Sequence, residues 1–242
     1  MDNHPGAPFS PIAAHRTRAV VYSLLAASGI CLFLLSARAF LAWDIRWTGF
    51  FGNLVLAWIP LIFSWLLCIQ LDRPLRRRWL IGILFLVWLL FFPNAAYIVT
   101  DLVHLKSRDP IPRWFDYILI TAYAWTGLFL GYVSLTLLHH RVRAAFGRLA
   151  GWGFVAIMLG LSSLGIYVGR FFRWNSWDVI TRPWKPLGDL VKFLELPTLK
   201  QVCGFCAAFF LLSVLVYLVL HAIAHLHAPE PARSRIEDGP GS

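Results

Sequence analysis

The feature that most constrains this chain is a series of long apolar segments separated by short clusters of charge. Such segments lie at about residues 19–37, 49–71, 79–99, 117–138, 150–172 and 202–223. A run of about 18 or more apolar residues is long enough to cross the ~30 Å hydrocarbon layer as a helix. The runs are continuous rather than alternating in polarity, which excludes a membrane β-barrel. The sequence therefore predicts an all-α fold, a polytopic transmembrane bundle of about six spanning helices.

Composition and charge agree with a protein in contact with lipid. The chain is 59% hydrophobic and 14% charged, whereas soluble domains carry about 25% charged residues. Its net charge is +10, but the basic residues lie beside the apolar runs, where they meet anionic lipid head groups. Many of the 12 tryptophans lie near segment ends, as in the aromatic belts of membrane proteins. We therefore expect membrane lipids as partners and no nucleic acid.

The chain divides into a central membrane domain and polar ends. Residues 1–18 are expected to form a cytoplasmic extension, 19–225 the transmembrane helical domain and 226–242 a disordered tail. The Ala37-Arg38-Ala39 stretch resembles a signal-peptide cleavage site, but the apolar run before it exceeds the usual ~7–15 residues. The longest loop, 173–201, contains a predicted interfacial helix at 187–196.

Orientation depends on the basic residues of the loops, which favour the cytoplasmic side. Lys and Arg number 11 on each face, with Arg38 and Arg170 both assigned to outer loops. On one face they crowd into the predicted loops 72–78 and 139–148, whereas on the other they mix with acidic residues. We therefore expect both termini in the cytoplasm.

Two polar motifs interrupt the apolar pattern. In the first, Asn94, Tyr97, Asp101 and His104 fall within an arc of about 80° on one helix face. Asp101 and His104 are one turn apart and could share a proton or a metal ion. The second motif comprises Arg170, Arg173, Trp174, Asn175, Ser176, Trp177 and Asp178. Arginine offers a planar fork of donors that suits a carboxylate or phosphate.

Both motifs end on the same predicted membrane face. We expect Asp101 to pair with Arg170 or Arg173, because isolated charges near hydrocarbon are costly. The result would be a polar pocket at the outer boundary, between the third and fifth helices. The alternative is a structural network in which the same residues anchor helix ends and cap a loop.

The two motifs also carry a resemblance to a known family. Pro93-Asn94-x-x-Tyr97-x-x-x-Asp101-Leu102 and Gly169-Arg170-Phe171-x-Arg173-Trp174-Asn175-Ser176-Trp177-Asp178 resemble the motifs of the domain-of-unknown-function 1361 family. The similarity covers roughly residues 50 to 220. The family consists of bacterial polytopic membrane proteins, so the resemblance implies a multi-pass protein of a bacterial plasma (inner) membrane. It implies no particular reaction.

Other signals are weaker. Cys203 and Cys206 form a C-x-x-C, either a thiol–disulfide pair or helix packing, whereas Cys31 and Cys68 are expected to pack in the apolar interior. His221, His225 and His227 close the last segment and, like His139 and His140, are interpreted as interfacial residues rather than metal ligands. Motifs of zinc proteases, serine hydrolases, P-loop ATPases and Rossmann enzymes do not occur, so no cofactor or metal is expected.

Three classes of function remain. The first is a binding or transport unit for a small or lipid-borne anion, with Arg170 and Arg173 as the cations. The second is an enzyme acting on a lipid or lipid-linked glycan, with Asp101 and His104 as acid, base or metal ligands. The third is a structural or assembly partner of a membrane complex. Catalytic residues, substrate and oligomeric state are not readable from the sequence.

Overall fold

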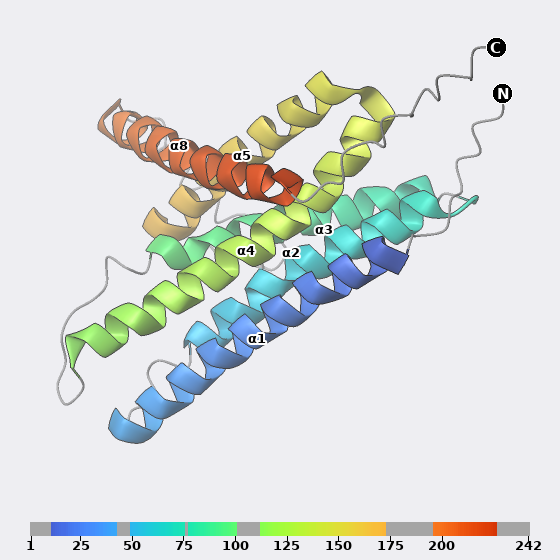
Figure 1. Ribbon diagram of the computed structural model, residues 1–242. Coiled ribbons are helices and arrows are strands. Elements are labelled where there is room, and N and C mark those ends of the chain that lie inside the picture. Colours follow the sequence, from blue (N-terminus) through green and yellow to red (C-terminus); the bar gives the residue numbers. More distant parts are fainter. Residues whose placement is uncertain (1–10, 43–48, 76, 101–111, 173–195, 227–242) are drawn as a thin grey trace, which may run out of the picture.

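The computed structural model describes residues 11–42, 49–75, 77–100, 112–172 and 196–226, which form a bundle of helices without strands (Figure 1). The helices are α1 (Pro11–Ala42), α2 (Gly49–Asp72), α3 (Arg78–Tyr97), α4 (Arg113–Phe146), α5 (Arg148–Phe171) and α8 (Leu196–Leu226). All six of these described helices are long and apolar enough to cross a membrane. The predicted all-α transmembrane bundle is confirmed.

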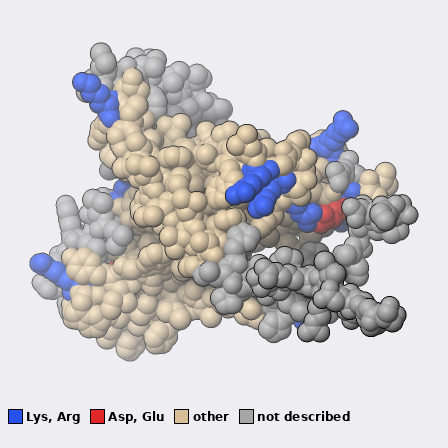
Figure 2. Space-filling model, turned by 45° about the horizontal axis from the view of Figure 1, so that its top comes forward, with Lys and Arg blue, Asp and Glu red and all other residues tan. Residues whose placement is uncertain are grey.

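The outer surface of the bundle is apolar, as contact with lipid requires. Mid-helix side chains such as Phe33, Leu86 and Leu215 have exposed fractions of 71%, 64% and 61%. In water such exposure would be costly, whereas against acyl chains it costs nothing, and the helices satisfy their own backbone polar groups. Figure 2 shows one face on which uncharged residues dominate and Lys and Arg form small separate groups.

Helix α4 is central to the bundle, and it packs against α1, α2, α3 and α5. Helix α5 also packs against α3 and α8, whereas α2 and α3 pack along each other. Trp88 of α3 is fully buried, and its indole N–H donates to the Ser134 hydroxyl of α4 at 3.1 Å. This hydrogen bond gives a buried polar group a partner in an otherwise apolar interior.

Glycines set the closest helix approaches in the bundle. Gly127 and Gly131 of α4 face Ala95 of α3, and a Cβ at Gly131 would lie 2.9 Å from the Ala95 Cβ. A Cβ at Gly165 of α5 would lie 2.7 Å from Cγ of Pro93. Close approach through small residues is the usual way in which membrane helices pack. By contrast, Gly153 and Gly160 of the glycine-rich α5 face open space.

The structure corrects two expectations about the loops. The predicted loop 139–148 is almost wholly helical, because α4 continues to Phe146 and only Gly147, at φ +90°, separates it from α5. At 34 residues, α4 is roughly 51 Å long and extends beyond the ~30 Å hydrocarbon layer. Arg38 and Arg170 likewise lie in helices α1 and α5 rather than in loops. The predicted loop between α2 and α3 is confirmed.

Candidate functional site

The C-terminal ends of α3 and α5 meet at one end of the bundle, where Arg170 joins them. Its Nη2 donates to the backbone carbonyl of Thr100 at 3.0 Å. Its guanidinium carbon lies 5.8 Å from the centroid of the Tyr97 ring, within the range of a cation–π contact. The first and second polar motifs are therefore neighbours in space, although about 70 residues separate them in sequence.

Local structure holds these groups in place. After Tyr97 the chain tightens into a 3₁₀ turn at 98–100, where the Thr100 hydroxyl donates to the Tyr97 carbonyl at 2.7 Å. Arg170 occupies the last turn of α5, which is the favourable end of a helix for a cation. The rings of Tyr167 and Phe171 stack beside it with centroids 4.4 Å apart. The guanidinium is thus presented by two packed helix ends.

Three of the predicted site residues lie in the part of the chain that the structure describes. These are Asn94 and Tyr97 of α3 and Arg170 of α5, all of them half-buried. The others are outside the described residues, namely Asp101, His104, Arg173, Trp174, Asn175, Ser176, Trp177 and Asp178. The pairing of Asp101 with Arg170 or Arg173, and the acid, base or metal role of Asp101 and His104, therefore stay predictions.

A second polar contact at this end of the bundle was not expected from the sequence. Arg38 in the last part of α1 forms a two-pronged ion pair with Asp116 in the first turn of α4. The Nε of Arg38 donates to Oδ1 of Asp116 at 2.6 Å, and its Nη2 donates to Oδ2 at 3.2 Å. Only 3% of Arg38 and 5% of Asp116 is exposed. The apolar run continues past Arg38 to Leu41, and this was the signal that its charge lies inside the membrane and needs a partner.

The opposite end of α4 carries a buried cluster of aromatic rings and histidines. His139 is 1% exposed, and its Nδ1 shares a 2.7 Å hydrogen bond with the Tyr217 hydroxyl of α8. Trp152 of α5 lies edge-on to the His139 ring, and His221 stacks on Tyr217. His139 is therefore enclosed by α5 and α8, and its predicted depth at the cytoplasmic interface stays a prediction. The cluster fastens α8 to α4.

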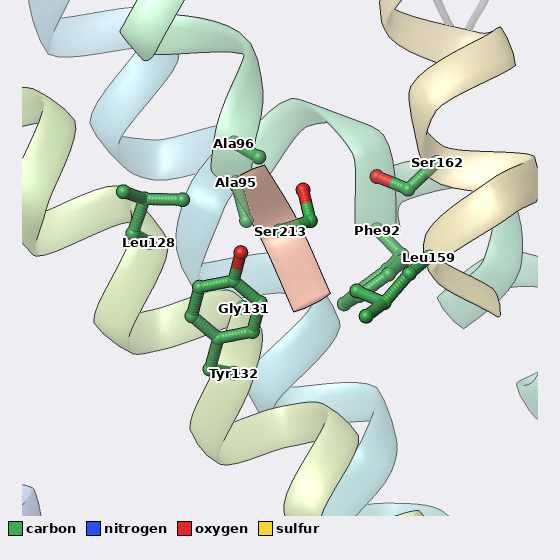
Figure 3. Close-up of a pocket in the computed structure, with 9 residues that line it drawn as sticks. All are labelled: Phe92, Ala95, Ala96, Leu128, Gly131, Tyr132, Leu159, Ser162 and Ser213. Carbon is green, nitrogen blue, oxygen red and sulfur yellow. The ribbon is translucent and has the colours of Figure 1, made fainter. Parts of the chain in front are cut away.

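A small pocket with hydroxyl groups lies deep between α3, α4, α5 and α8 (Figure 3). Its volume is about 10 Å³, roughly the space of one water molecule. The hydroxyls of Tyr132, Ser162 and Ser213 lie around it, and Phe92 and Leu159 supply apolar walls. A second cavity of about 180 Å³ adjoins it, and the two share Leu128, Tyr132 and Ser213.

Cysteines and metal-binding groups add no further centre among the described residues. Cys31 and Cys68 are buried, as predicted, and Cys203 and Cys206 of α8 are free thiols. No group of three or more His, Cys, Asp or Glu side chains converges in the described ranges. The side chain of His225 and all of His227 lie outside those ranges.

The helices and their apolar exterior define the chain as a multi-pass integral membrane protein with a polar centre where α3 and α5 end. It belongs to the domain-of-unknown-function 1361 (DUF1361) family, described as proteins of unknown function, whose model matches residues 52–216. This match confirms the resemblance seen in the two polar motifs. It begins in α2, so α1 lies outside it. No curated protein and no solved structure is significantly similar to the chain.

Proposed function

We propose that the site formed by the ends of α3 and α5 binds the phosphate or carboxylate of an anionic lipid or lipid-linked molecule. The observation that carries this proposal is the position of Arg170. Its guanidinium is held between the Thr100 carbonyl and the Tyr97 ring, at the end of a membrane-spanning helix. At this depth a cation meets lipid head groups rather than bulk water.

The chemistry of arginine supports an anionic ligand. A guanidinium stays charged at any physiological pH and offers five N–H donors in a planar fork, which matches two oxygens of a phosphate or carboxylate. The packed ends of α3 and α5 immobilise it, so little side-chain entropy is lost when a ligand binds. In sequence, the second motif adds Arg173, Asn175 and Ser176 as further donors and Trp174 and Trp177 as interfacial side chains.

Lipid retention by variants tests this proposal. The purified protein is extracted from membranes that contain phosphatidylglycerol, and bound lipids are counted by native mass spectrometry. Arg170→Gln is expected to lose bound anionic lipid, and Arg170→Lys to keep part of it, because a lysine retains the charge without the fork. The matched control is Arg113→Gln, which removes the same charge from an exposed position at the same end of the bundle.

The lipid counts distinguish a specific anion site from general electrostatic attraction and from a structural role of Arg170. Loss in Arg170→Gln but not in Arg113→Gln supports a specific site. Equal loss in both variants points to general attraction of anionic lipid to a basic protein and contradicts the site. If the parent, Arg170→Gln and Arg113→Gln are all folded and retain the same amount of anionic lipid, the contacts of Arg170 are structural.

We infer further that the protein lies in a bacterial plasma membrane with both termini in the cytoplasm, so that the Arg170 site faces outward. The support is the crowding of arginine in the turn at 73–78 and at the joined ends of α4 and α5. Alkaline phosphatase fused after Arg78 should be inactive. Activity of that fusion would reverse the orientation.

A further inference from the structure

The contact between α4 and α8 is the second notable feature of the bundle. The two helices touch through the His139–Tyr217 hydrogen bond and through the rings of Tyr132 and Tyr217, whose centroids are 6.0 Å apart. From this crossing near the C-terminal end of α8, the ribbons diverge toward the N-termini of both helices (Figure 1). We name the space that the residues of the second cavity line between these helices the α4–α8 cleft.

The cavity of about 180 Å³ lies in this cleft. Its walls come from Val99 after α3, Ala124 and Leu128 of α4, and Phe209 and Val216 of α8. An apolar cavity of about 150 Å³ is known to accept benzene, so this volume accommodates a stretch of about six carbon atoms. The walls carry few polar groups, which suits a hydrocarbon and not a hydrated ligand.

The cleft opens to the lipid side of the bundle. Thr121 and Trp125 of α4 and Leu212 of α8 line it and are exposed. All three lie inside membrane-spanning helices, so their exposed surfaces meet acyl chains. From Thr121 to Tyr132 the cleft follows α4 for roughly 16 Å, about half the thickness of the hydrocarbon layer. This is the depth of one leaflet.

The outer end of the cleft adjoins the Arg170 site. Val99 lines the cleft, and the next residue, Thr100, accepts the hydrogen bond from Arg170. At its deep end the cleft meets the small pocket of Tyr132, Ser162 and Ser213, whose volume of about 10 Å³ admits no hydrocarbon chain (Figure 3). A cation at the mouth followed by an apolar wall about one leaflet deep matches the head group and acyl chain of an anionic lipid, and the small hydroxyl-lined pocket limits how deep the chain can enter.

We infer that the α4–α8 cleft holds a hydrocarbon chain of an anionic lipid, which enters sideways from the bilayer while its head group lies at Arg170. This inference rests on the proposed anion site and identifies its ligand as a membrane lipid rather than a water-soluble anion. About six carbons of the chain lie within the cavity, and the remainder lies against the exposed faces of Trp125 and Leu212.

Photo-crosslinking locates the chain directly. The full-length protein is reconstituted in phosphatidylcholine vesicles that contain phosphatidylglycerol with a photoreactive diazirine in one acyl chain. After irradiation, crosslinked residues are mapped by mass spectrometry. We expect adducts to concentrate on cleft residues such as Leu128, Leu212 and Val216, and excess soluble glycerol phosphate should not reduce them.

Variants that fill the cleft provide the control. Thr121→Trp blocks the exposed mouth without disturbing the core, and Ala124→Phe fills the wall. Either should lower cleft adducts roughly tenfold, since several methylene contacts are displaced. The matched control is Ala208→Phe, which adds a ring to an exposed position of α8 that does not line the cleft. It should leave the adducts unchanged.

The results separate failure of the inference from failure of the proposed function. If filled variants keep Arg170-dependent retention of phosphatidylglycerol while adducts spread evenly over all helices, the anion site stands and the cleft inference fails. If cleft adducts form equally with photoreactive phosphatidylcholine and persist in Arg170→Gln, the cleft accepts any lipid and the anion site fails. Protein–protein crosslinks on cleft residues instead of lipid adducts would identify a second copy as the occupant and overturn the inference.

Discussion

The buried ion pair between Arg38 and Asp116 makes a sharp prediction about stability. Both residues are at least 95% buried, and two hydrogen bonds join their side chains. Removing one partner removes the attraction but leaves the other charge buried in a medium of low dielectric constant, which costs about 3–5 kcal/mol in buried pairs. Replacing both by apolar residues of similar size removes attraction and desolvation penalty together, and such replacements are often neutral or stabilising.

Each single variant should lose stability. In Arg38→Met a buried carboxylate loses its ion-pair partner, and in Asp116→Leu a buried guanidinium loses its carboxylate. A guanidinium stays charged at any physiological pH, so it cannot avoid the cost of burial by becoming neutral. We therefore expect each single change to cost about 3–5 kcal/mol.

A double-mutant cycle measures these effects. Unfolding free energies of the parent, both single variants and Arg38→Met/Asp116→Leu are obtained by titrating sodium dodecyl sulfate into mixed micelles while tryptophan fluorescence is followed. We expect the double variant to be more stable than either single one, with a coupling of at least about 3 kcal/mol. Additive losses would refute the reasoning.

The chain offers a matched control for this cycle. Arg141 of α4 and Asp72 of α2 form an ion pair of the same kind, in which 35% and 51% of the side chains are exposed. Exposed pairs contribute only about 0–1 kcal/mol, so the cycle of Arg141→Met and Asp72→Leu should show a small coupling. A coupling equal to that of the buried pair would show that burial is not the cause.

Three further predictions follow from the packing and the polar motifs. Gly165→Ala should lower the free energy of unfolding by about 1–3 kcal/mol, because the new Cβ would lie 2.7 Å from a proline ring atom of α3. The control in the same titration is Gly160→Ala, which should be neutral or slightly stabilising because Gly160 faces open space. Tyr217→Phe should cost about 1–3 kcal/mol, since it leaves the buried histidine of α4 without its 2.7 Å partner; an unchanged unfolding midpoint would contradict this. If Asp101 pairs with Arg170, neutralising both should cost less than the sum of the single losses, and additive losses would argue against the pair.

The sequence alone was sufficient to predict the membrane class and the spanning segments. Hydropathy is a local property: each apolar run is long enough to cross the bilayer whatever its neighbours are, and lipid requires it to be a helix. The buried positions of Cys31 and Cys68 followed from the same runs. The polar motifs at the ends of the third and fifth segments could also be recognised, because each keeps its chemistry within a few residues.

Which helices face each other was decided only by the tertiary structure. The pairing of Arg38 with Asp116 depends on the rotation of α1 and α4 about their axes, and an apolar segment exposed to lipid carries little record of that rotation. The burial of His139 likewise depends on α8 crossing α4 at Tyr217, about 78 residues further along the chain. The cleft between these helices is lined by Val99 and by residues of α4 and α8, a combination that no single segment of sequence specifies.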